Sequence, residues 1–404
     1  MRPSWVTALN ELGDPRWVAL DEQALLVEAS ARTGLDDFGE DTFRKPLGVL
    51  LESIERDARL HFIGRVLARD EIVNLLENRL RITAECARHR DITQVEVSQP
   101  IFITGLPRTG TSLLHELFSC DRASRVPLAW EVRHPCPPPE AASYDRDPRI
   151  ARADRAIGIW NAIVPEYPTI HELGATIPVE CIMITAHEFR SDQLAATNQA
   201  SSYAVWLATA DLRPAYELHR RFLQVLSWKA PRERWVLKAP SHLASLDALL
   251  AVYPDARIVQ THRDPLRVMG SVTSTLAATA RVRSDQVDTA RLRTWFGGEA
   301  CAALLERASQ MRETAIARDA SFVDVRYADL MRDPLATISS VYRQLGLELR
   351  SEAAERMSAY LAAKPKDKHG AHDYAFAETG FDVGLERQRF IAYQTRYGVP
   401  PEEP

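Results

Sequence analysis

The chain has 404 residues, 46% of them hydrophobic and 26% charged, which is typical of a globular protein with a large core. Its formal net charge of −5 excludes a general basic surface for nucleic acid or an anionic membrane, so any anion site must be built locally. The five cysteines form no CxxC pair and indicate reduced thiols. Since neither a signal-like N-terminus nor a run of 18 apolar residues is present, we expect a cytoplasmic protein without a membrane span.

The first 95 residues carry helical patterns. Two apolar stripes recur at helical spacing, and they are formed by Leu47, Leu50, Leu51 and Ile54 and by Ile72, Leu75, Leu76 and Leu80. Residues 150–230 also carry a pattern that is typical of helices. The proline-rich stretch 134–148 predicts a surface loop, because proline cannot continue a regular helix.

Short apolar runs follow from residue 100 onwards. Residues 100–104, 235–237, 256–260 and 322–325 predict buried strands, and helix-like stretches such as 241–253 separate them. This alternation predicts an α/β fold: a P-loop-like three-layer α/β/α core with a central parallel sheet. We expect a helical N-terminal region at 1–95 and an α/β domain at 96–404 with a helical insertion around 150–230.

A glycine-containing loop follows the first predicted strand. The segment Gly105–Ser112 has two glycines separated by four residues, then two hydroxyl residues and an apolar helix. Glycines let the backbone turn sharply and bring N–H groups against an anion, and the start of the helix adds its own N–H groups. The candidate phosphate-binding residues are Gly105, Pro107, Arg108, Thr109, Gly110, Thr111 and Ser112.

This loop departs from that of nucleoside triphosphatases. Such a loop carries lysine where Thr111 stands, and that lysine neutralises the β- and γ-phosphates beside magnesium. Here the cation is Arg108, three residues earlier. The departure weighs against ATP hydrolysis or kinase activity.

A second candidate anion site follows the strand 256–260. Arg263 carries a permanently charged guanidinium group, whose paired N–H donors match the geometry of a phosphate. Ser271 lies eight residues beyond it. The carboxyl ends of parallel strands are where such sheets bind ligands, so we expect Arg263 near the glycine loop.

Together these motifs resemble the sulfotransferases that use 3′-phosphoadenosine-5′-phosphosulfate (PAPS), in particular the bacterial branch with a helical N-terminal region. The resemblance covers roughly residues 98–385. It implies that Gly105–Ser112 binds the 5′-phosphosulfate, that Arg263 and Ser271 bind the 3′-phosphate, and that Tyr327 lies near the adenine. A basic loop at Lys366–Gly370, with Lys368 and Gly370, is the counterpart of the family's nucleotide-closing loop.

The sequence departs from the family pattern at three positions. Arg108 stands where many members have lysine. Leu113 stands where many members have tryptophan, so packing near the adenine must differ. Lys238 matches a catalytic lysine, whereas His242 is displaced by two residues from the family's histidine.

Sulfuryl transfer needs a base for the acceptor and positive charge on the transferring group. Lys238 and Arg108 can supply the charge. His242 is the favoured base, with Glu131 and then His134 as alternatives.

The resemblance implies transfer of a sulfuryl group from PAPS to a hydroxyl, or an amine, of a small-molecule, lipid or glycan acceptor. PAP (3′-phosphoadenosine-5′-phosphate) is then the product, and neither a metal nor a nucleic-acid partner is expected. Two alternatives stay open: a P-loop kinase or NTPase that needs magnesium, and a non-catalytic nucleotide-binding module. The sequence identifies neither the acceptor nor the oligomeric state.

Overall fold

A computed structural model describes residues 2–169, 172–295, 297–364, 376 and 380–403. The chain forms two compact units. Unit 1 comprises Met1–Val97, Pro127–Pro231 and Leu276–Val287, and unit 2 comprises Ser98–Val126, Arg232–Thr275 and Asp288–Pro404. The division into an N-terminal region and an α/β domain with an insertion stays a prediction.

Unit 2 is built on a five-stranded sheet with the strand order β2-β3-β1-β4-β5, in which every pair is parallel. The strands are β1 Ile101–Gly105, β2 Ser124–Arg125, β3 Arg234–Lys238, β4 Arg257–His262 and β5 Ser321–Arg326. The four predicted apolar runs thus correspond to β1, β3, β4 and β5. All five residues of β1 are buried, as expected for the central strand of a sheet covered on both faces.

The strand order determines which face each helix covers. The connection from β1 to β2 through α5 (Thr111–Ser119) runs in one direction along the sheet, and the connection from β3 to β4 through α12 (Leu246–Val252) runs in the other. Since crossovers are right-handed, α5 and α12 lie on opposite faces. The helix α15 (Gly298–Ile316) packs against α12 and α19 (Val383–Tyr397).

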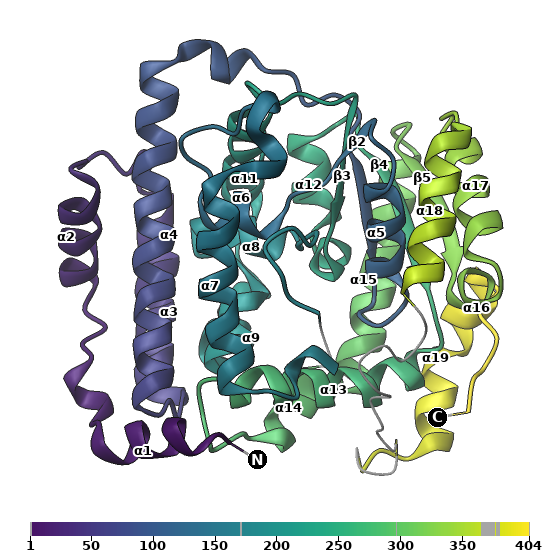
Figure 1. The fold of residues 1–404 in the computed structure, drawn as a ribbon. Helices are drawn as coiled ribbons and strands as arrows, with labels where there is room; N and C mark the ends of the chain where they lie inside the picture. Colours follow the sequence, from purple (N-terminus) through teal and green to yellow (C-terminus); the bar gives the residue numbers. More distant parts are fainter. Residues whose placement is uncertain (1, 170–171, 296, 365–375, 377–379, 404) are drawn as a thin grey trace. The chain divides into compact units, whose positions relative to one another are not determined.

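The helices α17 (Pro334–Gln344) and α18 (Ser351–Ala363) return to the face that α5 covers. The ring of Tyr342 stacks on that of Phe118 with 5.0 Å between centroids. The Nε atom of Arg356 donates to the carbonyl oxygen of Cys120 at 2.7 Å. Helices therefore cover both faces of the sheet, and the predicted three-layer α/β/α core is confirmed (Figure 1).

The remaining elements of unit 2 are three short elements and part of one longer helix. They are η7 Pro240–Ala244, α14 Thr289–Trp295, α16 Tyr327–Arg332 and the first part of α13 Pro265–Arg281, which ends in unit 1. The helix-like stretch 241–253 is interrupted at Ser245, whose φ of −138° and ψ of 31° lie outside the helical region. It forms the 3₁₀ turn η7 and the helix α12.

The described residues of unit 1 form helices and 3₁₀ turns, with one isolated antiparallel bridge between Leu128 and Pro178. Its α-helices are α1 Ser4–Leu12, α2 Glu22–Thr33, α3 Arg44–Asp57, α4 Phe62–Arg88, α6 Ala129–Arg133, α7 Pro148–Ile163, α8 Ile182–Thr185, α9 Asp192–Asn198, α10 Ser201–Leu207 and α11 Arg213–Ser227. Its 3₁₀ turns are η1 Pro15–Trp17, η2 Asp41–Phe43, η3 Arg90–Gln94, η4 Ala141–Arg146, η5 Tyr167–Thr169 and η6 Ala186–Glu188. The predicted loop 134–148 thus contains one 3₁₀ turn, η4. Both predicted apolar stripes are buried, in α3 and α4.

Buried polar contacts join the three chain segments of unit 1. Arg283 donates through Nη1 to Asn198 Oδ1 at 2.7 Å and through Nη2 to Glu71 Oε2 at 2.9 Å. Arg79 forms a buried ion pair with Glu188. Because an unpaired buried charge is very costly, these contacts fix how residues 276–287 pack on the helices before them. No helix in the described part of the chain is long and apolar enough to cross a membrane.

Gly64 tests this packing. An added Cβ there would lie 2.0 Å from the carbonyl oxygen of Arg283, whereas at Gly48 the nearest atom, Oε2 of Glu22, is 3.9 Å away. Both glycines lie within helices. We expect Gly64→Ala to destabilise the protein by about 1–3 kcal/mol, because backbone must shift. Gly48→Ala should be neutral or stabilising by up to about 1 kcal/mol. Thermal unfolding of both variants checks this, and equal melting temperatures would contradict it.

Candidate active site

The strand order of unit 2 places a topological switch point at the carboxyl ends of β1 and β3. The connections that follow these neighbouring strands leave toward opposite faces of the sheet, which is the usual ligand site of an open parallel sheet. The loop after β1 contains the predicted phosphate-binding residues. The turn η7 after β3 follows Lys238 and contains His242.

Packing and backbone conformation require both glycines of the loop. At Gly105, with φ 145°, an added Cβ would lie 2.3 Å from Thr261 Oγ1 and 2.5 Å from the Thr261 carbonyl oxygen. At Gly110, with φ 89°, it would lie 2.6 Å from Leu330 Cδ2 and 3.4 Å from Tyr327 Cδ2. Backbone therefore excludes any side chain at Gly105, whereas at Gly110 the left-handed φ is what disfavours one, because the Leu330 side chain could move. Gly110 is also the N-cap of α5, so the loop leads directly into the first N–H groups of that helix.

Thr261 holds the loop against β4, and sequence reasoning missed it. Its Oγ1 donates to the carbonyl oxygen of Thr104 at 3.1 Å and lies 2.6 Å from Thr109 Oγ1. Thr109 Oγ1 also lies 2.6 Å from the carbonyl oxygen of Leu106. The position of Thr261 at the end of a strand, two residues before Arg263, was a usable signal.

Four of the predicted nucleotide-binding residues converge beside this loop. Arg108 donates through Nε to Ser271 Oγ at 3.1 Å. Arg263 donates through Nη1 to the carbonyl oxygen of Arg108 at 2.9 Å, and its guanidinium carbon lies 3.8 Å from the centroid of the Tyr327 ring. Two guanidinium groups, a hydroxyl and an aromatic ring thus gather from three separate chain segments: the loop before α5, the segment 263–271 and the start of α16.

The carboxylate of Glu402 lies on Arg263. Both Nε and Nη2 of Arg263 donate to it at 3.0 Å. The backbone N–H of Glu402 donates to Asp264 Oδ2 at 2.7 Å, and Arg387 contacts both Asp264 and the Glu402 carbonyl oxygen. No sequence signal distinguished Glu402 from the other acidic residues of the chain.

His262 anchors the end of β4 from within the core. Its ring nitrogens lie 2.9 Å from Tyr393 Oη and 2.8 Å from Asp324 Oδ1, and Arg312 donates to Asp324 Oδ2 at 2.8 Å. Burial lowers the pKa of His262 despite the nearby Asp324 carboxylate. Burial alone would raise the pKa of Asp324. Hydrogen bonds from Arg312 and His262 outweigh the effect of burial and hold the pKa of Asp324 well below its usual range. This network fixes the backbone just before Arg263.

Lys238 ends β3 and is 3% exposed. Its Nζ donates to Ser112 Oγ at 3.2 Å, so it lies at the first turn of α5. Nearby, His115 Nε2 is 3.0 Å from the carbonyl oxygen of Val236. Burial, and then the charge of Lys238, lower the pKa of His115 to about 3. Lys238 therefore contributes positive charge beside a neutral histidine.

His242 lies in η7, buried against β1. Its ring meets that of Phe102 edge-on, with 5.0 Å between centroids. The Thr104 hydroxyl donates to the carbonyl oxygen of Ala239 at 3.1 Å and so ties this turn to β1.

The other two candidate bases belong to unit 1. Glu131 is buried in α6, and its Oε2 accepts from the backbone N–H of Leu128 at 3.2 Å as a helix cap. His134 follows α6; burial, and then the charges of nearby arginines, lower its pKa to about 3. Lys368, Gly370 and the rest of Lys366–Gly370 lie outside the described residues. Across the described ranges, no group of three or more His, Cys, Asp or Glu side chains is arranged to hold a metal ion.

A family model described as "Sulfotransferase family" matches residues 100–351. The chain belongs to this family. The match includes β1, the glycine loop, Lys238, Arg263, Ser271 and Tyr327.

Solved structures of the sulfotransferase family share the fold over nearly the whole chain. Sulfotransferase STF1 from Mycobacterium tuberculosis H37Rv is 34% identical, with a TM-score of 0.80, over 93% of this chain and 99% of that one. Sulfotransferase STF9 from Mycobacterium avium is 28% identical, with a TM-score of 0.85, over 96% and 99%.

Curated relatives match a shorter stretch. The omega-hydroxy-beta-dihydromenaquinone-9 sulfotransferases of Mycobacterium bovis and Mycobacterium tuberculosis are 26% identical to this family member over 288 residues. This alignment covers 65% of this chain and 66% of theirs.

Proposed function

We propose that this protein transfers a sulfuryl group from PAPS to a hydroxyl group of an acceptor, and releases PAP. One observation supports this most directly: Arg108, Ser271, Arg263 and Tyr327 converge beside a glycine loop that lacks the triphosphatase lysine. A donor with two separate phosphate groups needs such a pair of anion sites. ATP would leave the site around Arg263 without a phosphate.

The donor's groups are assigned to residues as follows. The loop Gly105–Ser112 and the first turn of α5 bind the 5′-phosphosulfate through backbone N–H groups and hydroxyls. Arg263 and Ser271 bind the 3′-phosphate. Tyr327 lies against the adenine.

The transfer forms one bond and breaks one. The acceptor oxygen attacks sulfur, and the bond between sulfur and the bridging phosphate oxygen breaks. PAP leaves with the electron pair of that bond, and the acceptor proton passes to a base. Lys238 and Arg108 stabilise the charge that develops on the sulfuryl and leaving oxygens. His242 serves as the base, with Glu131 as the alternative and His134 after it.

The acceptor proposal rests on the curated relatives. Their names specify an omega-hydroxylated menaquinone, which is a lipid alcohol. We therefore favour a hydroxyl over an amine, and a lipid alcohol over other small molecules or glycans.

Nucleotide binding tests the donor assignment. PAP should raise the melting temperature of the wild type, whereas ATP with magnesium should not. Arg263→Ala should weaken PAP binding by about 10- to 100-fold, because charge-assisted hydrogen bonds to phosphate are lost. Arg318→Ala, an exposed arginine of unit 2, is the control. Stabilisation by ATP with magnesium alone would instead favour a kinase or NTPase, and a loss of turnover without weaker PAP binding would contradict the role of Arg263.

The base can be assigned with conservative variants. Donor turnover is measured as PAP release, with an omega-hydroxylated menaquinone analogue as acceptor. His242→Gln should lower kcat by about 10²–10⁴-fold. It should also remove the part of the pH profile of kcat that requires a neutral imidazole. Glu131→Gln should leave the pH profile of kcat unchanged. A His242→Gln enzyme with wild-type turnover would transfer the role to Glu131.

Glu402 should oppose donor binding, because its carboxylate lies on the guanidinium assigned to the 3′-phosphate. Glu402→Gln removes a like charge beside that phosphate and should tighten PAP binding about 3- to 10-fold, a modest gain because the pair is partly exposed to solvent. The exposed neighbour Glu403, changed to glutamine, is the matched control. Calorimetric titration with PAP measures both variants. Weaker binding to Glu402→Gln would show that Glu402 positions Arg263 rather than competing for it.

A further inference from the structure

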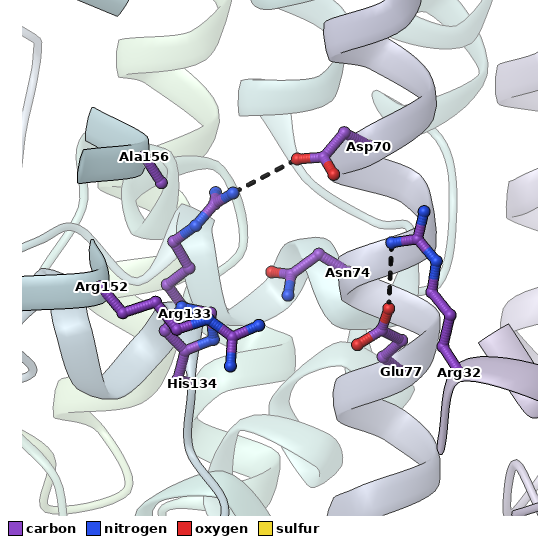
Figure 2. A pocket seen from close by; sticks show the side chains of 8 residues that line it. All are labelled: Arg32, Asp70, Asn74, Glu77, Arg133, His134, Arg152 and Ala156. Atoms are coloured by element: carbon purple, nitrogen blue, oxygen red, sulfur yellow. Dashed lines mark hydrogen bonds and ion pairs between the residues drawn. The ribbon is translucent and has the colours of Figure 1, made fainter. Parts of the chain in front are cut away.

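The long helix α4 contributes to two different surfaces of unit 1. Toward its middle it lines a polar pocket, shown in Figure 2, in which the carboxylates of Asp70 and Glu77 are each paired with an arginine. These carboxylates are therefore already neutralised within the protein. At its beginning α4 instead packs against α1, and the outward face of α1 is apolar.

Exposed apolar side chains are concentrated on α1 and on the turn that follows it. Twelve large apolar side chains are exposed in the described part of the chain, and four of them lie between residues 5 and 17. They are Trp5 and Leu9, each 44% exposed, Leu12, 77% exposed, and Trp17, 71% exposed. A surface helix normally turns its apolar stripe toward the core, so a group of this kind marks an interaction surface.

The helical period places three of these side chains in one stripe. Trp5, Leu9 and Leu12 have the spacing i, i+4, i+7, and the exposed Ala8 lies beside them on the same side of the helix. Val6 points to another side and is fully buried in a cluster of apolar residues. The helix α1 is therefore anchored by one apolar residue, and a larger apolar stripe faces outward.

Polar contacts on both sides of this anchor hold α1 in its orientation. Before the helix, Arg2 donates through Nε to Asp285 Oδ1 and through Nη2 to the carbonyl oxygen of Arg281, both at 2.6 Å. Near the end of the helix, Asn10 Oδ1 accepts from the backbone N–H of Ile63 at 3.0 Å. Because the stripe is already ordered, burying it against a partner costs little conformational entropy.

The turn η1 is fixed in a similar way. Arg65 donates through Nε to the carbonyl oxygen of Val18 at 2.8 Å, and the ring of Trp17 meets that of Phe62 edge-on with 6.2 Å between centroids. Gly13 packs against the same Phe62 ring, since an added Cβ would lie 2.3 Å from its Cδ1. Trp17 therefore extends the apolar surface beyond the end of α1.

Size and charge together favour a lipid surface as the partner. Even if each of the four side chains were as large as tryptophan, at about 250 Å², their exposed fractions would offer no more than about 600 Å². A stable dimer needs roughly 800 Å² from each partner. Residues 2–17 contain two arginines and two acidic residues, so this surface carries no net charge and suits neutral lipid. Tryptophan and leucine are also the residues that a helix lying in a membrane interface buries.

We propose that α1 and Trp17 dock this protein onto the surface of a neutral lipid bilayer, with Trp5, Leu9 and Leu12 inserted among the headgroups. The helix has nine residues, so it lies along the interface and does not span the bilayer. The choice of a bilayer rests in part on the proposed function, because a lipid-alcohol acceptor resides in a membrane. Docking then brings the enzyme to the surface that holds its acceptor.

Flotation with phosphatidylcholine vesicles tests the docking, with the whole chain and without donor or acceptor. Wild type should float with the vesicles, and no less at roughly 1 M than at roughly 0.1 M salt, because the surface has no net charge. Leu9→Gln/Leu12→Gln should partition at least about tenfold more weakly, because two exposed leucines no longer leave water. Val205→Gln is the control, because it removes an apolar side chain that is 72% exposed on α10 and should leave flotation unchanged.

Tryptophan fluorescence locates the contact. Vesicles with brominated acyl chains should quench the fluorescence of wild type, and should quench Trp5→Phe/Trp17→Phe less although phenylalanine preserves docking. Three results overturn the proposal: wild type that does not float, wild type that floats only with anionic lipid, and a double glutamine variant that floats as wild type does. Quenching that is equal in wild type and the phenylalanine variant also overturns it.

Sedimentation distinguishes a second copy of the chain from a bilayer. A dimer in wild type that Leu9→Gln/Leu12→Gln abolishes would make the stripe an interface between two copies, and the proposal would be wrong. Equal melting temperatures of wild type and variants show that the variants are folded. If wild type docks but does not sulfate an omega-hydroxylated menaquinone analogue held in the vesicles, the docking stands and the proposed acceptor is wrong.

Discussion

The close approach of Gly105 to Thr261 determines how the site in unit 2 is assembled. β1 and β4 are neighbouring parallel strands, and Gly105 pairs with Thr261 where both strands end. A Cβ at residue 105 would lie 2.3 Å from Thr261 Oγ1, so only glycine lets the two backbones meet. Because they meet, the loop after β1 and the Arg263 turn after β4 share one edge of the sheet. Every anion contact that we propose for the donor depends on this junction.

A protein with net negative charge must concentrate cations locally to bind a polyanionic nucleotide. Unit 2 does so with Arg108, Lys238 and Arg263, each held by backbone or hydroxyl oxygens. Arg263 is further ordered by the ring of Tyr327. Since these side chains are held before any ligand arrives, little rotamer entropy remains to be lost on binding. In the protein without ligand, the Glu402 carboxylate pairs with the guanidinium of Arg263 and neutralises its charge.

Much of the fold and part of the site could be predicted from sequence. Four strands carry strong apolar runs, and the glycine loop and Arg263 follow strands in a recognisable order. β2 could not be found, because two residues, Ser124 and Arg125, carry no periodic pattern. Glu402 could not be found either, because its contact with Arg263 joins positions 139 residues apart and no motif marks it. The break at Ser245 was not predicted, because the stretch 241–253 is helix-like on both sides of it.

Arg108 combines its charge with an unfavourable backbone conformation. Its φ of 65° lies in the left-handed region, where a side chain costs roughly 1–2 kcal/mol. Glycine would relieve that strain, but the guanidinium beside Ser271 would be lost. The loop is therefore a place where backbone stability and the function proposed for Arg108 favour different residues. Under that proposal, selection for thermal stability alone would tend to remove this arginine, and a screen that also scores turnover would be needed to keep it.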